Sequence, residues 1–409
     1  MTDSKDSQHW DVFFYVQHLL GMGHLQRAAT LAEALHRAGL RVRLVSGGLP
    51  VDQIAIRGPE VIQLPPIRAT DETFTLTNEA GAPIDDDFKA RRRDLLLKLF
   101  KETNPRLLLI ELFPFGRRQM RFELLPLLEF AGSMPQRPAI VSSLRDILNA
   151  HNKPEKIRWM LDTFKRHFDS AIVHGDPDFL PLEESFSEAS EIASHLQYSG
   201  YIVRPPTNEE MSGCTTGRGE ILVSIGGGAV GLNLVEAALE ARAMTSHVKS
   251  RWRFLLGPNM PEHDFDRIVQ NAKGIEENED GGSIIVERAR PDFPLLLRNC
   301  RLSISQGGYN TVMEILARKT PAIIVPFAAG GETEQTFRSR KLAEMGYLEL
   351  LEEDQLSAVN LAAAIDREIA KDKGTNPSTL NLDLEGGGKT AYILKEQINR
   401  VADGRLGQP

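Results

Sequence analysis

The chain has only two cysteines among its 409 residues, Cys214 and Cys300. So few cysteines cannot build a disulfide framework, and their spacing matches no zinc or redox motif. No apolar run approaches the roughly 20 residues that a membrane-spanning helix needs. The first ten residues, MTDSKDSQHW, are polar and lack the apolar centre of a signal peptide. We therefore expect a cytoplasmic protein, at most peripheral on the inner face of a membrane.

Positive charge is also in deficit, because the formal net charge is −8. This deficit argues against nucleic acid as the main partner. One segment, residues 91–121, is nevertheless rich in Lys and Arg. Arg91–Arg93 with LLLKLFK, and FPFGRRQMRFELLPLLEF after it, fit either contact with an anionic lipid or acceptor phosphate, or ordinary amphipathic helices. The sequence leaves both interpretations open.

Short β-branched runs alternate with helical stretches along the chain. Runs at 12–16, 42–46 and 107–110 are separated by segments with helical periodicity, and this alternation predicts parallel sheets with helices on both faces. The stretch 204–219, RPPTNEEMSGCTTGRG, breaks the pattern, which restarts at Ile221. We therefore predict two doubly wound, Rossmann-like domains facing across a cleft, 1–204 and 220–409, joined by a linker at 205–219. The last helix, near 390–401, belongs either to the second domain or packs back on the first.

Two strand-to-helix turns are rich in glycine. The first is Gly21-Met22-Gly23-His24, and the second contains Gly226, Gly227 and Gly228. Glycine lets the backbone approach a ligand closely, and the helix N-terminus that follows favours an anion such as pyrophosphate. The structural alternatives are a plain tight turn for the second motif and a helix-capping role for His24.

The richest segment runs from 305 to 314, where a strand ends, two glycines turn the chain and a helix begins. Its candidate residues are Ser305, Gln306, Gly307, Gly308, Asn310, Thr311 and Glu314. Glu314 lies one turn into the helix, where its carboxylate is able to accept hydrogen bonds from ribose hydroxyls. After the next strand, Glu334 and Gln335 begin another helix on the same sheet edge and are placed to bind sugar hydroxyls.

Taken together in their order along the chain, these motifs resemble those of the glycosyltransferase family 28. The resemblance is most specific over residues 284–345. The resemblance implies a GT-B fold, a UDP-sugar donor, and inverting transfer with neither metal nor cofactor. It implies that Arg204 lies near the donor phosphates, that Glu314 holds the ribose, and that the backbone at Ala289 and Arg290 contacts the base. The full donor set is Gly23, Arg204, Gly226, Gly227, Gly228, Arg290, Ser305, Gln306, Gly307, Gly308, Asn310, Thr311, Glu314, Glu334 and Gln335.

Two departures from the family pattern bear on the substrates. Glu334 stands where the family's peptidoglycan enzyme has a second glutamine, so the donor sugar stays open between a hexose and an N-acetylhexosamine. The N-terminal half lacks that enzyme's tyrosine-containing glycine loop, which argues against a peptidoglycan acceptor. The acceptor is otherwise a hydroxyl compound, with lipid- and polysaccharide-linked acceptors both open.

We therefore predict an inverting glycosyltransferase with 1–204 on the acceptor side and 220–409 on the donor side. His24 is the candidate base, and Asp146 and Asp176, near strand ends, would orient it or bind acceptor. The alternatives are a UDP-sugar hydrolase in which His24 activates water, and a nucleotide-sugar-binding protein without turnover. Two further motifs carry no site. Asp85-Asp86-Asp87 is better explained as capping charge than as a metal ligand, and Gly388-Lys389-Thr390 lacks the upstream glycine of a P-loop.

Overall fold

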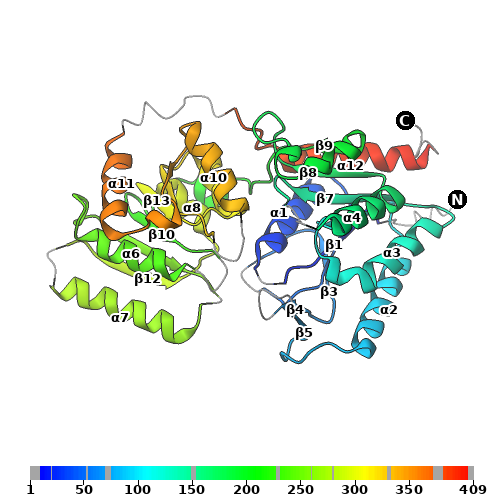
Figure 1. The fold of residues 1–409 in the computed structure, drawn as a ribbon, viewed down its shortest axis with the longest axis horizontal. Coiled ribbons are helices and arrows are strands. Elements are labelled where there is room, and N and C mark those ends of the chain that lie inside the picture. Colours follow the sequence, from blue (N-terminus) through cyan, green and yellow to red (C-terminus); the bar gives the residue numbers. More distant parts are fainter. Residues whose placement is uncertain are drawn as a thin grey trace, which may run out of the picture. The chain divides into compact units, whose positions relative to one another are not determined.

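The computed structural model describes residues 10–19, 21–51, 54–69, 75–148, 153–226, 231–258, 260–278, 281–328, 333–371 and 381–403. The chain forms two compact units. The first combines Met1–Ile202 with Leu382–Pro409, and the second is Val203–Asn381. Figure 1 shows one layered α/β body for each unit.

The first unit is built on a seven-stranded sheet of order β3-β2-β1-β6-β7-β8-β9, in which every neighbouring pair is parallel. Its strands are β1 (Val12–Val16), β2 (Val42–Ser46), β3 (Glu60–Gln63), β6 (Leu107–Glu111), β7 (Ala139–Arg145), β8 (Ser170–His174) and β9 (Leu196–Tyr198). Its helices are α1 (Gly23–Arg37), α2 (Asp86–Thr103), α3 (Arg121–Ser133), α4 (Pro154–His167) and α12 (Gly386–Ala402). Short elements complete it: β4 (Arg68–Ala69), β5 (Leu76–Thr77), η1 (Arg118–Met120), η2 (Leu182–Glu184) and η3 (Ser187–His195).

The strand β1 explains why this sheet is covered on both sides. All five of its residues are buried, as expected for a central parallel strand. Successive side chains point to opposite faces, so Val12, Phe14 and Val16 join the core beneath α1 and α12. Phe13 and Tyr15 join the core beneath α2, α3 and α4.

The second unit has a six-stranded parallel sheet of order β12-β11-β10-β13-β14-β15. Its strands are β10 (Ile221–Ser224), β11 (Trp252–Leu256), β12 (Ile284–Arg288), β13 (Leu302–Ser305), β14 (Ala322–Ile324) and β15 (Glu349–Leu350). Its helices are α5 (Asn208–Met211), α6 (Leu232–Arg242), α7 (Glu262–Asn278), α8 (Phe293–Asn299), α9 (Tyr309–Arg318), α10 (Glu334–Glu344), α11 (Ala358–Ala370) and the short η5 (Glu353–Gln355).

In both sheets the strand order reverses beside the first strand, between β1 and β6 and between β10 and β13. In each sheet, the connections that follow the two strands of the pair run to opposite faces of the sheet. A doubly wound sheet has its crevice at the carboxyl ends of such a pair. Ligands of doubly wound proteins bind at this switch point. The candidate residues are therefore assessed at the ends of these four strands.

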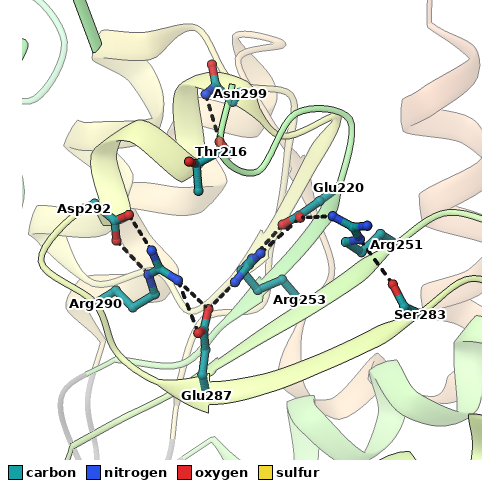
Figure 2. A network of polar contacts seen from close by, with 9 residues as sticks. All are labelled: Thr216, Glu220, Arg251, Arg253, Ser283, Glu287, Arg290, Asp292 and Asn299. Atoms are coloured by element: carbon teal, nitrogen blue, oxygen red, sulfur yellow. Dashed lines mark hydrogen bonds and ion pairs between the residues drawn. The ribbon is translucent and has the colours of Figure 1, made fainter. Parts of the chain in front are cut away.

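The domain boundaries differ from those expected. Residues 205–219 are packed into the second unit, because Thr207 and Glu210 form a capping box around α5 and Arg318 bonds the Glu210 carboxylate at 2.8 and 3.1 Å. Asn299 Nδ2 also donates to the Cys214 carbonyl at 2.8 Å. It donates to the Thr216 carbonyl at 2.8 Å as well (Figure 2).

Of the two placements left open for the last helix, the structure shows the return to the first unit. Leu394 and Ile398 of α12 lie in the core shared with α1, and Figure 1 shows α12, in red, among the elements of this unit. Backbone bonds reinforce the return of the chain, since Tyr201 N donates to Asp383 O at 2.7 Å.

Two charged motifs of the first unit have structural roles. Asp85 caps α2 by accepting from the Phe88 amide at 2.7 Å, which confirms the capping interpretation. Arg92 is fully buried and pairs with Glu123, with Nε–Oε2 and Nη2–Oε1 distances of 2.7 and 3.1 Å. Arg92 is therefore unable to contribute to a lipid-binding surface. Within the described ranges, no helix is long and apolar enough to cross a membrane.

Candidate functional site

His24 lies in the first turn of α1, at the carboxyl end of β1. Its Nδ1 is 3.0 Å from Oε1 of Glu111, the last residue of β6. The two side chains come together because β1 and β6 are neighbours on either side of the switch point. The first unit therefore places a histidine–carboxylate pair where doubly wound sheets bind ligands.

Glu111 is held as a carboxylate although it is only 1% exposed. Arg27 of α1 forms an ion pair with its Oε1, and Ser143 of β7 donates to its Oε2 at 2.7 Å. Burial alone would raise the pKa of Glu111. The positive charge of Arg27 and the hydrogen bonds from His24 and Ser143 outweigh burial and hold that pKa well below its usual range.

The His24 imidazole is neutral at physiological pH. Burial, followed by the nearby charge of Arg117, lowers its pKa to about 3. Because ionised Glu111 only accepts hydrogen bonds, the proton of neutral His24 is placed on Nδ1, which leaves the Nε2 lone pair available. A neutral imidazole oriented in this way is able to accept a proton at Nε2.

The two aspartates predicted near His24 have different surroundings. Asp146 is fully buried directly after β7. Asp176, in the loop after β8, accepts from the backbone amides of Asp178 at 3.0 Å and Asp383 at 2.9 Å. The Asp176 carboxylate thus fastens the returning C-terminal segment. The partner of His24 that sequence analysis missed is Glu111, whose signal was a charged residue ending the apolar run 107–110.

In the second unit, Gln306 connects the two glycine turns. It follows β13, and its Oε1 accepts from the amide of Gly226 after β10 at 3.1 Å. Gly231, at the N-cap of α6, has φ of 108°. A Cβ atom there would lie 2.8 Å from Gln306 Nε2, so this position requires glycine. Gly227 and Gly228, predicted to bind the donor, lie outside the described residues.

The N-terminus of α9 has the features of an anion site. Gly307 and Gly308 precede the helix, and the predicted residues Asn310 and Thr311 lie in its first turn. A Cβ atom on Gly307 would lie 2.8 Å from Ser339 Oγ, so the turn packs closely against α10. Among the described residues, the buried hydroxyls of Ser305 and Ser339 have no hydrogen-bond partner. Hydroxyls of this kind, together with helix N-terminal amides, suit a phosphate oxygen.

Glu314 is bound by two arginines. Arg204 Nε donates to its Oε1 at 2.7 Å, and Arg318 pairs with its Oε2. Arg318 also bonds Glu210 of α5. Arg204 and Glu314, both predicted to bind the donor, are thus in direct contact. Carboxylate oxygens carry about four acceptor positions, so Glu314 retains capacity for a ligand hydroxyl.

Glu334 and Gln335 begin α10 as predicted, with intramolecular partners. Glu334 is buried and forms an ion pair with Arg338 at 2.6 Å, and Arg338 also donates to the Gly307 carbonyl at 3.3 Å. Gln335 Oε1 accepts from the Phe327 amide at 3.2 Å. Arg338 thus joins α10 to the α9 turn, and Gln335 joins it to the segment after β14.

Arg290 follows β12 and is fixed by two carboxylates, Asp292 at 2.6 and 2.8 Å and Glu287 at 3.2 and 3.3 Å (Figure 2). The hydrogen bonds to Asp292 raise the pKa of Arg290 further above its ordinary value. Arg253 extends the network from Glu287 to Glu220, which accepts two of its hydrogen bonds. These ion pairs hold the loop after β12 in place. Across the part of the chain that the structure describes, no cluster of three His, Cys, Asp or Glu residues is arranged to hold a metal ion.

Comparisons with known proteins agree with this geometry. Residues 222–385 match the family model of the glycosyltransferase family 28 C-terminal domain. The chain is 25% identical over 194 residues to the UDP-N-acetylglucosamine--N-acetylmuramyl-(pentapeptide) pyrophosphoryl-undecaprenol N-acetylglucosamine transferase of Paramagnetospirillum magneticum, covering 45% of this chain and 50% of the relative. For the Prochlorococcus marinus (strain NATL2A) enzyme of the same name, identity is 25% over 130 residues, with coverage of 32% and 34%. The matches thus span between about a third and a half of these relatives.

Solved structures cover nearly the whole chain. The calicheamicin glycosyltransferase CalG4 aligns with a TM-score of 0.55 at 17% identity, covering 98% of this chain and 100% of that one. Acinetobacter baumannii MurG aligns with a TM-score of 0.55 at 13% identity, covering 96% and 99%. The predicted GT-B fold with two Rossmann-like domains is confirmed, as is the predicted similarity to family 28.

Proposed function

We propose that this chain is an inverting, metal-independent glycosyltransferase that moves a hexose or N-acetylhexosamine from a UDP-sugar to a hydroxyl acceptor. The observation that carries the proposal is the α9 turn, where a helix N-terminus and two unpartnered buried hydroxyls lie at the switch point of the segment that matches family 28. Such a turn suits a diphosphate.

In the proposed reaction the acceptor hydroxyl attacks the anomeric carbon of the donor. Its proton passes to His24 Nε2, and the bond between the anomeric carbon and the phosphate oxygen breaks with its electrons leaving on UDP. Attack opposite the leaving group inverts the anomeric centre. Negative charge grows on the diphosphate as it leaves, and the α9 amides with Arg204 would stabilise that charge. This stabilisation supports transfer without a metal ion.

The donor's nucleoside is proposed to bind through Glu314, which would accept from the ribose hydroxyls, and through the backbone at Ala289 and Arg290. Ala289 N donates to Leu256 O at 2.8 Å, and the paired Arg290 side chain keeps this loop in place. Glu334 and Gln335 would contact the sugar. Because Glu334 is already bound by Arg338, its carboxylate has a fixed orientation toward any ligand.

The acceptor is proposed to be lipid-linked, which would place the protein at the inner face of a membrane. The curated relatives bear names that specify a pyrophosphoryl-undecaprenol acceptor. The same proposal predicts that the first unit, with His24, binds the acceptor.

Calorimetric titration with UDP, with and without EDTA, tests the donor site. We expect binding with a Kd between micromolar and millimolar, unchanged by EDTA. Glu314→Gln should weaken it by about 10- to 100-fold, because a hydrogen bond to a charged group contributes roughly 1.5–3 kcal/mol. Glu344→Gln, at an exposed position of α10, is the matched control and should leave binding unchanged.

A product assay with a panel of labelled UDP-sugars then separates transfer from its alternatives. A glycoside formed only with acceptor supports the proposal. Release of free sugar in water alone would instead identify a hydrolase that uses His24 to activate water. Absence of UDP binding would contradict the donor site, and loss of binding in EDTA would contradict metal independence.

A further inference from the structure

A row of buried polar side chains continues from His24 across the first unit. Its members follow the sheet order from β1 to β9: His24, Glu111, Ser143, His174 and Ser199. Glu111 and His174 end β6 and β8, Ser143 lies near the end of β7, and Ser199 directly follows β9. Ser143, His174 and Ser199 are all completely buried.

Each member is within hydrogen-bonding distance of the next. His24 Nδ1 lies 3.0 Å from Glu111 Oε1, and Ser143 Oγ lies 2.7 Å from Glu111 Oε2. His174 then connects the two serines, with Nε2 2.9 Å from Ser143 Oγ and Nδ1 2.9 Å from Ser199 Oγ. The row is thus a continuous chain of contacts ending at the candidate base.

The protonation states determine which group donates and which accepts in each hydrogen bond of the row. Ionised Glu111 only accepts, so the single hydroxyl proton of Ser143 points to Oε2. Ser143 Oγ must then accept from His174, which places a proton on His174 Nε2. Burial and the nearby charge of Arg27 lower the pKa of His174 to about 3, so this histidine is neutral. Its Nδ1 lies 2.9 Å from Ser199 Oγ, whose hydroxyl also donates to the Gly200 carbonyl at 3.1 Å. From His174 Nε2 through Ser143 and Glu111 to His24, each contact then has one donor and one acceptor, and Glu111 Oε1 accepts a hydrogen bond from His24 Nδ1–H.

Packing alone does not explain the row. Burying hydroxyls and an imidazole costs free energy unless each is hydrogen-bonded, and apolar side chains would fill the same space. The adjacent strand residue, Ser142, is equally buried but has a local role, since it donates to the Phe113 carbonyl at 2.8 Å.

We propose that Ser143 and His174 are positioning residues for glycosyl transfer, which hold Glu111 so that His24 keeps its proton on Nδ1 and its lone pair on Nε2. This inference rests on the proposed function of His24 as the base. Neither residue needs to touch the acceptor, because both act through Glu111.

Steady-state kinetics test the inference. Ser143→Ala should lower kcat by about 10- to 100-fold, by analogy with the loss when hydrogen-bond partners behind metal-binding histidines are removed. The KM for the UDP-sugar should stay the same, because the donor site lies in the other unit. Ser142→Ala, the matched control on the same strand, should keep wild-type kcat. His174→Gln, whose amide is able to donate to Ser143, should retain more activity than His174→Leu.

A second measurement is independent of turnover. In ¹H–¹⁵N correlation spectra of ¹⁵N-histidine-labelled protein, we expect His24 as the Nδ1–H tautomer and His174 as the Nε2–H tautomer. Ser143→Ala should move His24 toward the commoner Nε2–H form, and Ser142→Ala should not. Should Ser143→Ala fail to fold, His174→Gln and His174→Leu give the same comparison.

The outcomes distinguish this inference from the proposed function. A kcat within twofold of wild type in Ser143→Ala, or an unchanged His24 tautomer, overturns the positioning role. A protein that fails to transfer sugar, but whose His24 tautomer responds to Ser143→Ala, contradicts the proposed activity and retains the positioning of His24.

Discussion

Replacing Glu111 with glutamine tests the candidate base most directly. The carboxylate holds His24 through Oε1 and Ser143 through Oε2, and it neutralises the buried charge of Arg27. Glutamine has nearly the same shape, but one of its two positions carries an NH2 group that donates. When the amide oxygen takes the Oε1 position and accepts from Arg27, the NH2 group takes the Oε2 position. There it is unable to accept the hydrogen bond from Ser143.

Two magnitudes follow from this geometry. Breaking a buried ion pair costs roughly 3–5 kcal/mol of stability, because Arg27 is left buried at 3% exposure without its counter-ion. Disturbing the orientation and tautomer of His24 should remove most of the base contribution, which is about 10²- to 10⁴-fold in rate. The kinetic effect must therefore be separated from partial unfolding.

Glu123→Gln provides the matched control. Glu123 is equally buried, pairs with Arg92 in the same unit and has no hydrogen bond to His24 among the described contacts. Both variants should lose similar stability in urea denaturation. At a temperature where both are folded, only Glu111→Gln should lose kcat, and both should bind UDP like the wild type. A Glu111→Gln enzyme with near-wild-type kcat would refute the assignment of His24 and Glu111 as the base and its partner.

Two further predictions concern stability. The pKa of His24 and that of His174 are both about 3 in the folded chain, against an ordinary value of 6.5. Between pH 6.5 and pH 3, the unfolded chain therefore binds protons that the folded chain does not. Lowering the pH through this range should reduce the free energy of unfolding of the first unit by up to about 1.4 kcal/mol per pH unit for each histidine. Urea midpoints at pH 7 and pH 5 measure this loss, and equal midpoints would contradict it. Asp176→Ala should cost about 1–3 kcal/mol of stability, because two backbone amides lose their acceptor, while kcat is kept. Loss of kcat in a fully folded variant would return Asp176 to the catalytic candidates.

Much of the fold could be predicted because parallel sheets leave a strong local signal. The buried strands β1, β6 and β10 appear as short apolar runs. Each is followed by a segment whose amino-acid composition differs from that of the strand. The Gly23-His24 turn and the Ser305–Glu314 segment could be found for the same reason, since glycines and polar residues stand out directly after such runs.

The boundaries could not be predicted because they depend on contacts between distant segments. Thr207 and Glu210 carry the pattern of a capping box, but the proline-rich composition around them masked it. The core beneath α12 is set by α1, which lies near the other end of the chain, and no local feature of α12 indicates which sheet it covers. Composition alone therefore left open which unit the last helix belongs to.

The hydrogen-bonded row behind His24 could not be predicted for a different physical reason. Ser143 and His174 belong to strands whose other residues are mostly apolar, and alone each resembles a tolerated polar residue in a β-strand. Their meaning comes from strand order, because only the sequence β1-β6-β7-β8-β9 across the sheet brings His24, Glu111, Ser143 and His174 into line. The doubly wound topology, which the alternation of strands and helices predicts, already contains that order. Polar residues at the carboxyl ends of parallel strands are therefore best compared in sheet order rather than chain order, because sheet order puts Glu111 directly beside His24.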